Sequence, residues 1–218
     1  MMRKVVTVLI AALLIFSLVA CGNTVQNTKD TEKETSTSKE KEDQTSEKTT
    51  ATDAKKSDGK TLIVYFSWST SGNTKEMATY MKDQTGGDML ELVPANPYPT
   101  DYNETGDVAK VERDENARPE IKNLPKSISK YDKILVGYPI WWHTAPMIIG
   151  TFLEAYDLNG VDIYPFSQSA SMDTEQFDNS MDFVRENAKG ANVHDGLFTE
   201  PTDTDGMMNY LKANGFVK

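Results

Sequence analysis

Short apolar runs alternate with longer segments of helical periodicity between Thr61 and Lys218. The runs are apolar or β-branched and are bounded by turn residues, a pattern typical of buried strands. The expected strands are Leu62–Phe66, Asp88–Val93, Lys133–Tyr138, Asp162–Phe166 and Val193–Phe198. This alternation of strands and helices predicts an α/β fold.

Apolar residues at helical spacing fill most of the segments between these strands. Each expected helix begins near a residue that caps a helix or suits its first turn. These residues are Asn73, Pro146, Asp173 and either Thr202 or Asp203. Gln176 follows Asp173 by three residues and completes a capping-box pattern. The last helix is expected to run to Asn214 and to end before Gly215.

The section from Pro94 to Pro125 has the least regular pattern. Within it, Asn96–Pro99 is expected to be a loop and Glu104–Asp114 a charged helix. The remaining pattern predicts a five-stranded parallel sheet with right-handed crossovers and helices on both faces. Ligands of such sheets bind at the carboxyl ends of the strands, so the loops after the first, third and fourth strands should form one crevice.

The first 20 residues have the layout of a secretory signal peptide. Arg3 and Lys4 are followed by the apolar run Val5–Ala20, which is shorter than the roughly 20 residues of a membrane-spanning helix. The run closes on Leu18-Val19-Ala20-Cys21, which resembles the lipobox of bacterial lipoproteins. That resemblance implies cleavage before Cys21, lipidation of its thiol, and anchoring on the extracytoplasmic face of the cell membrane, as in Gram-positive surface lipoproteins.

Residues 21–60 are expected to form a disordered linker behind that anchor. The segment is rich in Lys, Glu, Asp, Ser and Thr, lacks aromatic residues, and its charges nearly cancel. The whole chain has a formal net charge of −10, so its acidic excess lies in the globular part, 61–218, and argues against nucleic acid as a partner. Cys21 is the only cysteine, so a disulfide within one chain is excluded.

Residues 67–74 follow the first strand and lead into the first helix. Unpaired amides and the helix dipole make such a helix start a binding place for a phosphate group. The segment is rich in hydroxyl groups and holds no lysine or arginine, which favours a phosphate monoester over a nucleoside triphosphate.

The phosphate segment and the loops after the third and fourth strands together resemble the flavodoxin family over nearly all of residues 61–218. Ser69-Thr70-Ser71-Gly72-Asn73-Thr74 matches the family pattern T/S-x-T/S-G-x-T, which holds the phosphate of FMN. The resemblance implies a doubly wound sheet of strand order 2-1-3-4-5 and FMN as cofactor. It implies phosphate contacts from Ser69, Ser71, Asn73 and Thr74, with Ser67 as an alternative first ligand.

The loop after the third strand is expected to hold the flavin ring. Its residues are Pro139, Ile140, Trp141, Trp142, His143 and Thr144. Adjacent side chains in extended backbone point to opposite sides, so one tryptophan is expected to cover the ring, and the sequence does not decide which. His143 either faces solvent or lies near the flavin, where a protonated imidazole would stabilise the reduced, anionic flavin.

The loop after the fourth strand departs most from the family, which often has glycines there. Its expected contacts are Ser167, Gln168, Ser169, Ala170 and Ser171, whose small members let the backbone approach the ring. Asp173 is interpreted as a helix cap rather than a catalytic acid. Tyr98 and Tyr102 are further candidates to cover the cofactor.

Several other kinds of chemistry are disfavoured by what the sequence lacks. Only two histidines are present, without clustered carboxylates, so no protein-built metal site is expected. No nucleophile elbow, dinucleotide-binding turn or P-loop ending is found. The leading hypothesis is an FMN-binding electron carrier that serves a redox partner protein or a small electron acceptor. The alternatives are an FMN-dependent NAD(P)H:quinone or flavin reductase, and a surface binding protein that has lost flavin.

Overall fold

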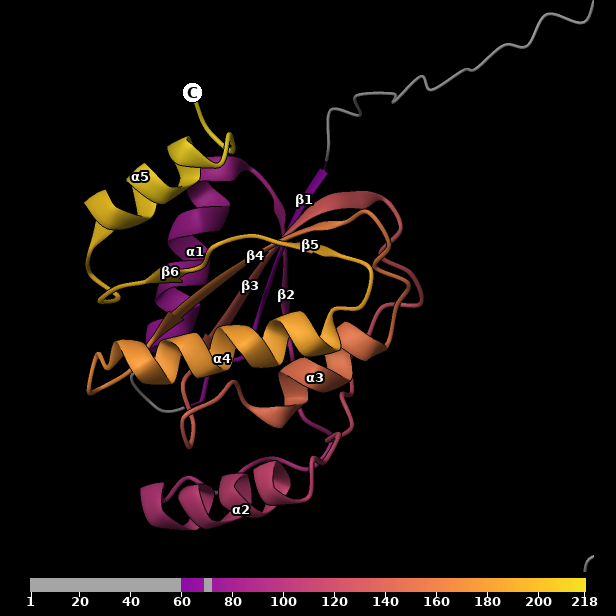
Figure 1. The fold of residues 1–218 in the computed structure, drawn as a ribbon, viewed down its shortest axis with the longest axis vertical. Helices are drawn as coiled ribbons and strands as arrows, with labels where there is room; N and C mark the ends of the chain where they lie inside the picture. Colours follow the sequence, from indigo (N-terminus) through magenta and orange to yellow (C-terminus); the bar gives the residue numbers. More distant parts are fainter. Residues whose placement is uncertain (1–59, 69–71) are drawn as a thin grey trace, which may run out of the picture. The chain divides into compact units, whose positions relative to one another are not determined.

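The computed structural model describes residues 60–68 and 72–218 (Figure 1). The expected signal peptide, Cys21, the linker and the candidate ligands Ser69, Thr70 and Ser71 lie outside the described residues. Among the helices that are described, none is both long and apolar enough to cross a membrane.

The sheet is parallel throughout and has the order β2-β1-β3-β4-β5, which confirms the predicted fold class. Its central strands are β1 (Lys60–Tyr65), β3 (Tyr131–Pro139) and β4 (Asp162–Gln168). The short strand β2 (Asp88–Glu91) pairs with β1 at one edge, and β5 (Asn192–Val193) pairs with β4 at the other. The first, third and fourth strands thus lie side by side, in the order that the flavodoxin resemblance implied.

The single fifth strand predicted over Val193–Phe198 is wrong, because the chain forms two strands there. A second short strand, β6 (Leu197–Phe198), also pairs with β4, and the register shifts by one residue between the two. Pro165 of β4 lies at the interruption and has no backbone N–H, so it offers no donor to a continuous ladder. The segment between β5 and β6 is therefore one residue longer than the part of β4 that it passes.

Helices cover both faces of the sheet (Figure 1). On one face, α3 (Met147–Glu154) and α4 (Thr174–Asn187) bury apolar side chains with alternate residues of β1 and β3. On the other face, α1 (Asn73–Thr85) and α5 (Thr204–Ala213) pack on the intervening residues of the same strands. This period-two alternation explains why the central strands are apolar along their whole length.

Aspartate side chains cap α4 and α5 as predicted. Asp173 accepts hydrogen bonds from the Glu175 and Gln176 amides, and Asp203 accepts one from the Gly206 amide. The prediction that Asn73 caps α1 is wrong. Gly72 is the N-cap, at φ +65°, and Asn73 is the first helical residue.

The charged helix predicted over Glu104–Asp114 exists as α2 (Tyr102–Asp114) and begins two residues earlier. Asp101 caps it by accepting from the amides of Asn103 and Glu104. The helix lies beyond the end of the sheet, next to α3, and only Thr105 and Ala109 of it are buried (Figure 1). It is therefore held by a small number of specific contacts rather than by a broad apolar face.

Candidate functional site

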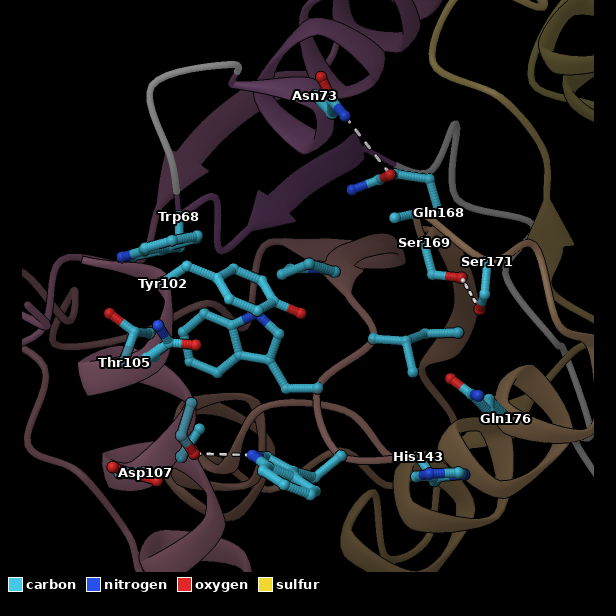
Figure 2. A pocket seen from close by; sticks show the side chains of 18 residues that line it. Trp68, Asn73, Tyr102, Thr105, Asp107, His143, Gln168, Ser169, Ser171 and Gln176 are labelled. Atoms are coloured by element: carbon cyan, nitrogen blue, oxygen red, sulfur yellow. Dashed lines mark hydrogen bonds between the residues drawn. The ribbon is translucent and has the colours of Figure 1, made fainter. Parts of the chain in front are cut away.

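A cavity of about 760 Å³ lies at the carboxyl ends of the central strands, where the switch point was expected (Figure 2). Ten of the predicted site residues line it: Asn73, Pro139, Ile140, Trp141, Trp142, His143, Gln168, Ser169, Ala170 and Ser171. The loops after β1, β3 and β4 therefore meet at one site. Five other predicted residues, Ser67, Gly72, Thr74, Thr144 and Ser167, do not line the cavity.

The start of α1 faces the cavity through Asn73. Its side-chain amide lies 3.5 Å from the Gln168 side-chain oxygen at the end of β4, which links the first and third loops (Figure 2). Gly72 supplies no side chain to cap the helix, so among the described residues the N-cap gives the first-turn amides no side-chain partner. Thr74 is buried, with 1% of its surface exposed. This helix start keeps the amide donors and positive dipole end that suit a phosphate group.

The residues after β3 form a tight turn. Trp141 and Thr144 exchange two backbone hydrogen bonds of 2.9 and 3.0 Å across it. The two central residues, Trp142 and His143, have φ angles of +48° and +65°, as in a type I′ turn, where Asn-Gly is favoured. A residue other than glycine in this left-handed backbone conformation costs on the order of 1–3 kcal/mol, so surrounding contacts must hold the turn in place.

The extended backbone assumed for the tryptophan pair is therefore wrong, and both tryptophans line the cavity. Trp141 points inward and packs edge-on against Phe66, Trp68 and Tyr98, with ring centroids 5.1–6.1 Å apart. The Trp142 ring instead points toward α2 and keeps 41% of its surface exposed.

Contacts with α2 hold Trp142 in place. Its indole N–H donates to the Gly106 carbonyl at 2.7 Å, drawn as a dashed line in Figure 2. The Arg113 guanidinium donates to the Trp142 carbonyl at 3.2 Å and lies 5.5 Å from the centre of the indole ring. A partly exposed cation over an aromatic face contributes about 0.5–1 kcal/mol. The strained turn is thus tied to a helix on the neighbouring wall of the cavity.

The loop after β4 presents small polar side chains to the cavity. Ser169 and Ser171 place their hydroxyl oxygens 3.3 Å apart, and the Ser169 hydroxyl accepts from the Met172 amide (Figure 2). Ser167 points elsewhere, because its buried hydroxyl donates to the Tyr138 carbonyl at 2.6 Å. Strand alternation explains this difference, since Ser167 belongs to β4 and precedes the loop.

One wall of the cavity is built largely by α2 and was not predicted from the sequence. The additional lining residues are Trp68, Tyr102, Asn103, Thr105, Gly106, Asp107, Ala109 and Gln176. Tyr102, named only as a possible cover, is 78% exposed and packs against Trp68, whose indole N–H donates to the Pro99 carbonyl. The capping Asp101 and the hydroxyl of Thr105, which also donates to Pro99, fix the start of this helix.

Charged side chains are scarce in the lining. Among the described lining residues, Asp107 is the only carboxylate, and no lysine or arginine is present. Behind the aromatic cluster, Glu112 accepts a hydrogen bond from the Tyr98 hydroxyl at 2.7 Å. Burial raises the pKa of the Glu112 carboxyl, and the bond from Tyr98 opposes that shift. The cavity itself thus offers aromatic faces, neutral hydrogen-bonding groups and a helix N-terminus.

No metal centre is formed by this part of the molecule. Within residues 60–68 and 72–218, no group of three or more histidine, cysteine or carboxylate side chains is placed to hold a metal ion.

Residues 60–213 match the family described as Flavodoxin, and the chain belongs to the flavodoxin family. A search of curated proteins returned no match. Among solved structures, a protein described as a flavoprotein from Bacteroides eggerthii is 32% identical, with a TM-score of 0.64. The alignment covers 73% of this chain and 99% of that one.

Two further structures are similar over the same region. A protein described as a flavoprotein from Bacteroides uniformis is 30% identical, with a TM-score of 0.63 and coverage of 71% of this chain and 98% of its own. A flavoprotein from Lactobacillus acidophilus, whose crystal structure is a complex with FMN, is 28% identical, with a TM-score of 0.57. That alignment covers 69% of this chain and 99% of the other.

Proposed function

We propose that this protein binds one FMN molecule in the cavity and acts as an electron carrier. The observation that carries the proposal is the meeting of three groups in one cavity: the α1 start, the tryptophan turn after β3, and the serine loop after β4. Family membership supports it, as does the FMN complex of the Lactobacillus acidophilus flavoprotein. When bound, the flavin supplies the redox chemistry, accepting and releasing one or two electrons.

The residues of this chain fit the two ends of the cofactor. The first-turn amides of α1, with the hydroxyls predicted as ligands at Ser69 and Ser71, suit a phosphate monoester without a cationic partner. Trp141, Trp142 and the neighbouring aromatic side chains suit a flat ring, because aromatic faces stack favourably. The polar side chains of Gln168, Ser169 and Ser171 can hydrogen-bond a heterocyclic edge.

The test is a binding titration on the full chain purified in detergent. The protein is expected to be yellow or, after removal of flavin, to take up added FMN with one-to-one stoichiometry. Riboflavin, which lacks the phosphate, is expected to bind much more weakly, because the α1 start then has no partner. A colourless protein that takes up no FMN would overturn the proposal and favour a binding protein that has lost flavin.

An electron carrier and a reductase of the same fold are separated by a turnover assay. The holoprotein alone is expected not to oxidise NADH or NADPH rapidly with a quinone acceptor. Rapid oxidation without a partner protein would instead assign an FMN-dependent reductase. As partner we propose a redox protein or small acceptor on the same side of the membrane.

We further propose that Cys21 carries a lipid that tethers the domain to the extracytoplasmic face of the cell membrane. The support is the sequence Leu18-Val19-Ala20-Cys21 after the apolar run. A single acyl chain anchors weakly, and lipoproteins of this type carry more than one. Cys21→Ser is expected to move the protein from the membrane fraction to the soluble fraction. Retention of the variant in the membrane fraction would contradict lipid anchoring at Cys21.

A further inference from the structure

We propose that Arg113 and Trp142 are positioning residues that tie the turn after β3 to α2 and so fix the flavin-binding geometry. The inference rests on the proposed function for the identity of the ligand. The tie consists of the Trp142 indole N–H donating to the Gly106 carbonyl and of Arg113 donating to the Trp142 carbonyl. Figure 2 shows the first of these contacts between the two walls of the cavity.

The turn needs such a tie because its backbone is unfavourable for its residues. A tryptophan at φ +48° followed by a histidine at φ +65° occupies positions that suit Asn and Gly. Strained backbone of this kind persists when surrounding contacts over-determine it. The two hydrogen bonds and the guanidinium over the indole ring are the contacts from α2 that do so at Trp142.

The tie also fixes one peptide unit. Arg113 holds the Trp142 carbonyl toward α2, and in a trans peptide the next N–H, that of His143, points the opposite way. Neither the Trp142 amide nor the His143 amide donates to another described residue. Both residues line the cavity, so these amides are available to acceptor atoms of a bound flavin.

The position of α2 also depends on its contacts with Trp142. The helix α2 buries only Thr105 and Ala109, yet six of its residues line the cavity. Its remaining anchors are single side-chain contacts, among them the Tyr98–Glu112 hydrogen bond. Loss of the Trp142 tie is therefore expected to loosen the α2 wall as well as the turn.

The first experiment compares Arg113→Gln with Lys110→Gln on the same helix. Each variant removes one positive charge and one of the two cationic partners of Asp114, but only Arg113 touches Trp142. Arg113→Gln is expected to weaken FMN binding about tenfold, the loss of one charge-assisted hydrogen bond, whereas Lys110→Gln changes it less than about twofold. The midpoint potential and visible spectrum of bound FMN are expected to shift only in Arg113→Gln.

Trp142→Phe keeps an aromatic ring and removes the indole donor. It is expected to weaken FMN binding to a similar degree, and Arg113→Gln combined with Trp142→Phe should lose less than the two single losses together, because the contacts act as a unit. The inference would be overturned if the affinity losses of the two single variants were fully additive in the double variant. It would also be overturned if Arg113→Gln had no larger effect than Lys110→Gln.

A second measurement judges the tie without flavin. In the ligand-free protein, the indole N–H of Trp142 is expected to exchange slowly with solvent, to exchange faster in Arg113→Gln, and to stay slow in Lys110→Gln. If the indole N–H exchanges as expected but the wild type takes up no FMN, the proposed function is wrong and the contact between the turn and α2 is still supported. If the two variants exchange at the same rate, the tie is wrong whatever FMN does.

Discussion

The turn residue His143 combines a cavity-lining position with a backbone conformation that suits glycine. Its φ of +65° places a side chain in the left-handed region, which costs an L-residue other than glycine about 1 kcal/mol or more. His143 is exposed and lines the cavity. A histidine at this strained position is therefore a place where stability and function can be measured separately.

His143→Gly is expected to unfold with a free energy about 1 kcal/mol higher than His143→Ala, because both variants lose the imidazole and only glycine relieves the backbone strain. Urea unfolding of the ligand-free protein measures this difference. The potential of bound FMN in His143→Ala then reports the imidazole alone. Equal stabilities of the two variants would mean that the turn is not strained at this position.

The carboxyl group of Glu112 gives the molecule a stability that depends on pH. Its pKa is raised in the folded state by burial, so its ionised form is penalised there. Protonation therefore favours the folded state, and this contribution is lost as the pH rises through the folded pKa. Glu112→Gln keeps an acceptor for the Tyr98 hydroxyl without the charge.

We therefore expect Glu112→Gln to be more stable than the wild type at neutral pH, and the difference to vanish as the pH falls through the pKa of Glu112. Urea midpoints of both proteins over a pH series measure this convergence. A gap that stays constant with pH would show that the charge of Glu112 does not set the difference.

At the scale of elements, Gly137 of β3 leaves space for the ring of Phe166 on β4. A Cβ atom on Gly137 would overlap the ring of Phe166, its partner on β4. Gly137→Ala is expected to lower the free energy of unfolding by about 3 kcal/mol, because neither the strand backbone nor a fully buried ring can move away easily. Thermal or urea unfolding tests this loss.

Phe166→Leu serves as the matched second change. Alone it should cost roughly 1–2 kcal/mol, because leucine is smaller than the buried phenylalanine and leaves part of its space unfilled. In the Gly137→Ala background it should restore part of the lost stability, because the smaller side chain leaves room for the new methyl group. The absence of any recovery would place the overlap elsewhere in the core.

The elements most completely predicted from sequence are those whose hydrophobic pattern is set by the sheet itself. The strands near Ile63, Leu135 and Ile163 read as buried because both of their faces are covered by helices. The prediction of a single fifth strand was wrong because the break in this strand depends on Pro165 in the neighbouring strand β4. The residues of the fifth strand itself do not reveal this long-range effect.

The candidate site was predicted where consecutive residues follow a strand and missed where another element folds over it. Asn73, Trp141 and Ser169 were found because each follows the carboxyl end of a strand. The α2 residues Thr105, Gly106 and Asp107 carry no local signal of a cavity, since only the path of the loop after β2 brings them there. The positive φ of Trp142 was missed for a related reason: its sequence does not favour it, and contacts with α2 maintain it.

At the scale of the whole molecule, the acidic charge acts on any flavin in the cavity. The formal net charge is −10, and no lysine or arginine is among the described residues that line the cavity. Adding an electron to the bound flavin brings negative charge into this field, which is unfavourable. The potential for the second electron is therefore expected to lie below that of free FMN.

This field effect can be separated from local contacts by salt. The Debye length falls from about 10 Å at 0.1 M to about 3 Å at 1 M ionic strength, so distant carboxylates are screened while hydrogen bonds to the ring remain. The second one-electron potential is expected to rise as sodium chloride increases, and the potential of free FMN under the same conditions is the control. A protein-specific rise would assign part of the low potential to the acidic surface. A potential that does not change with salt relative to free FMN would assign it to local contacts, and a value above that of free FMN would contradict the prediction.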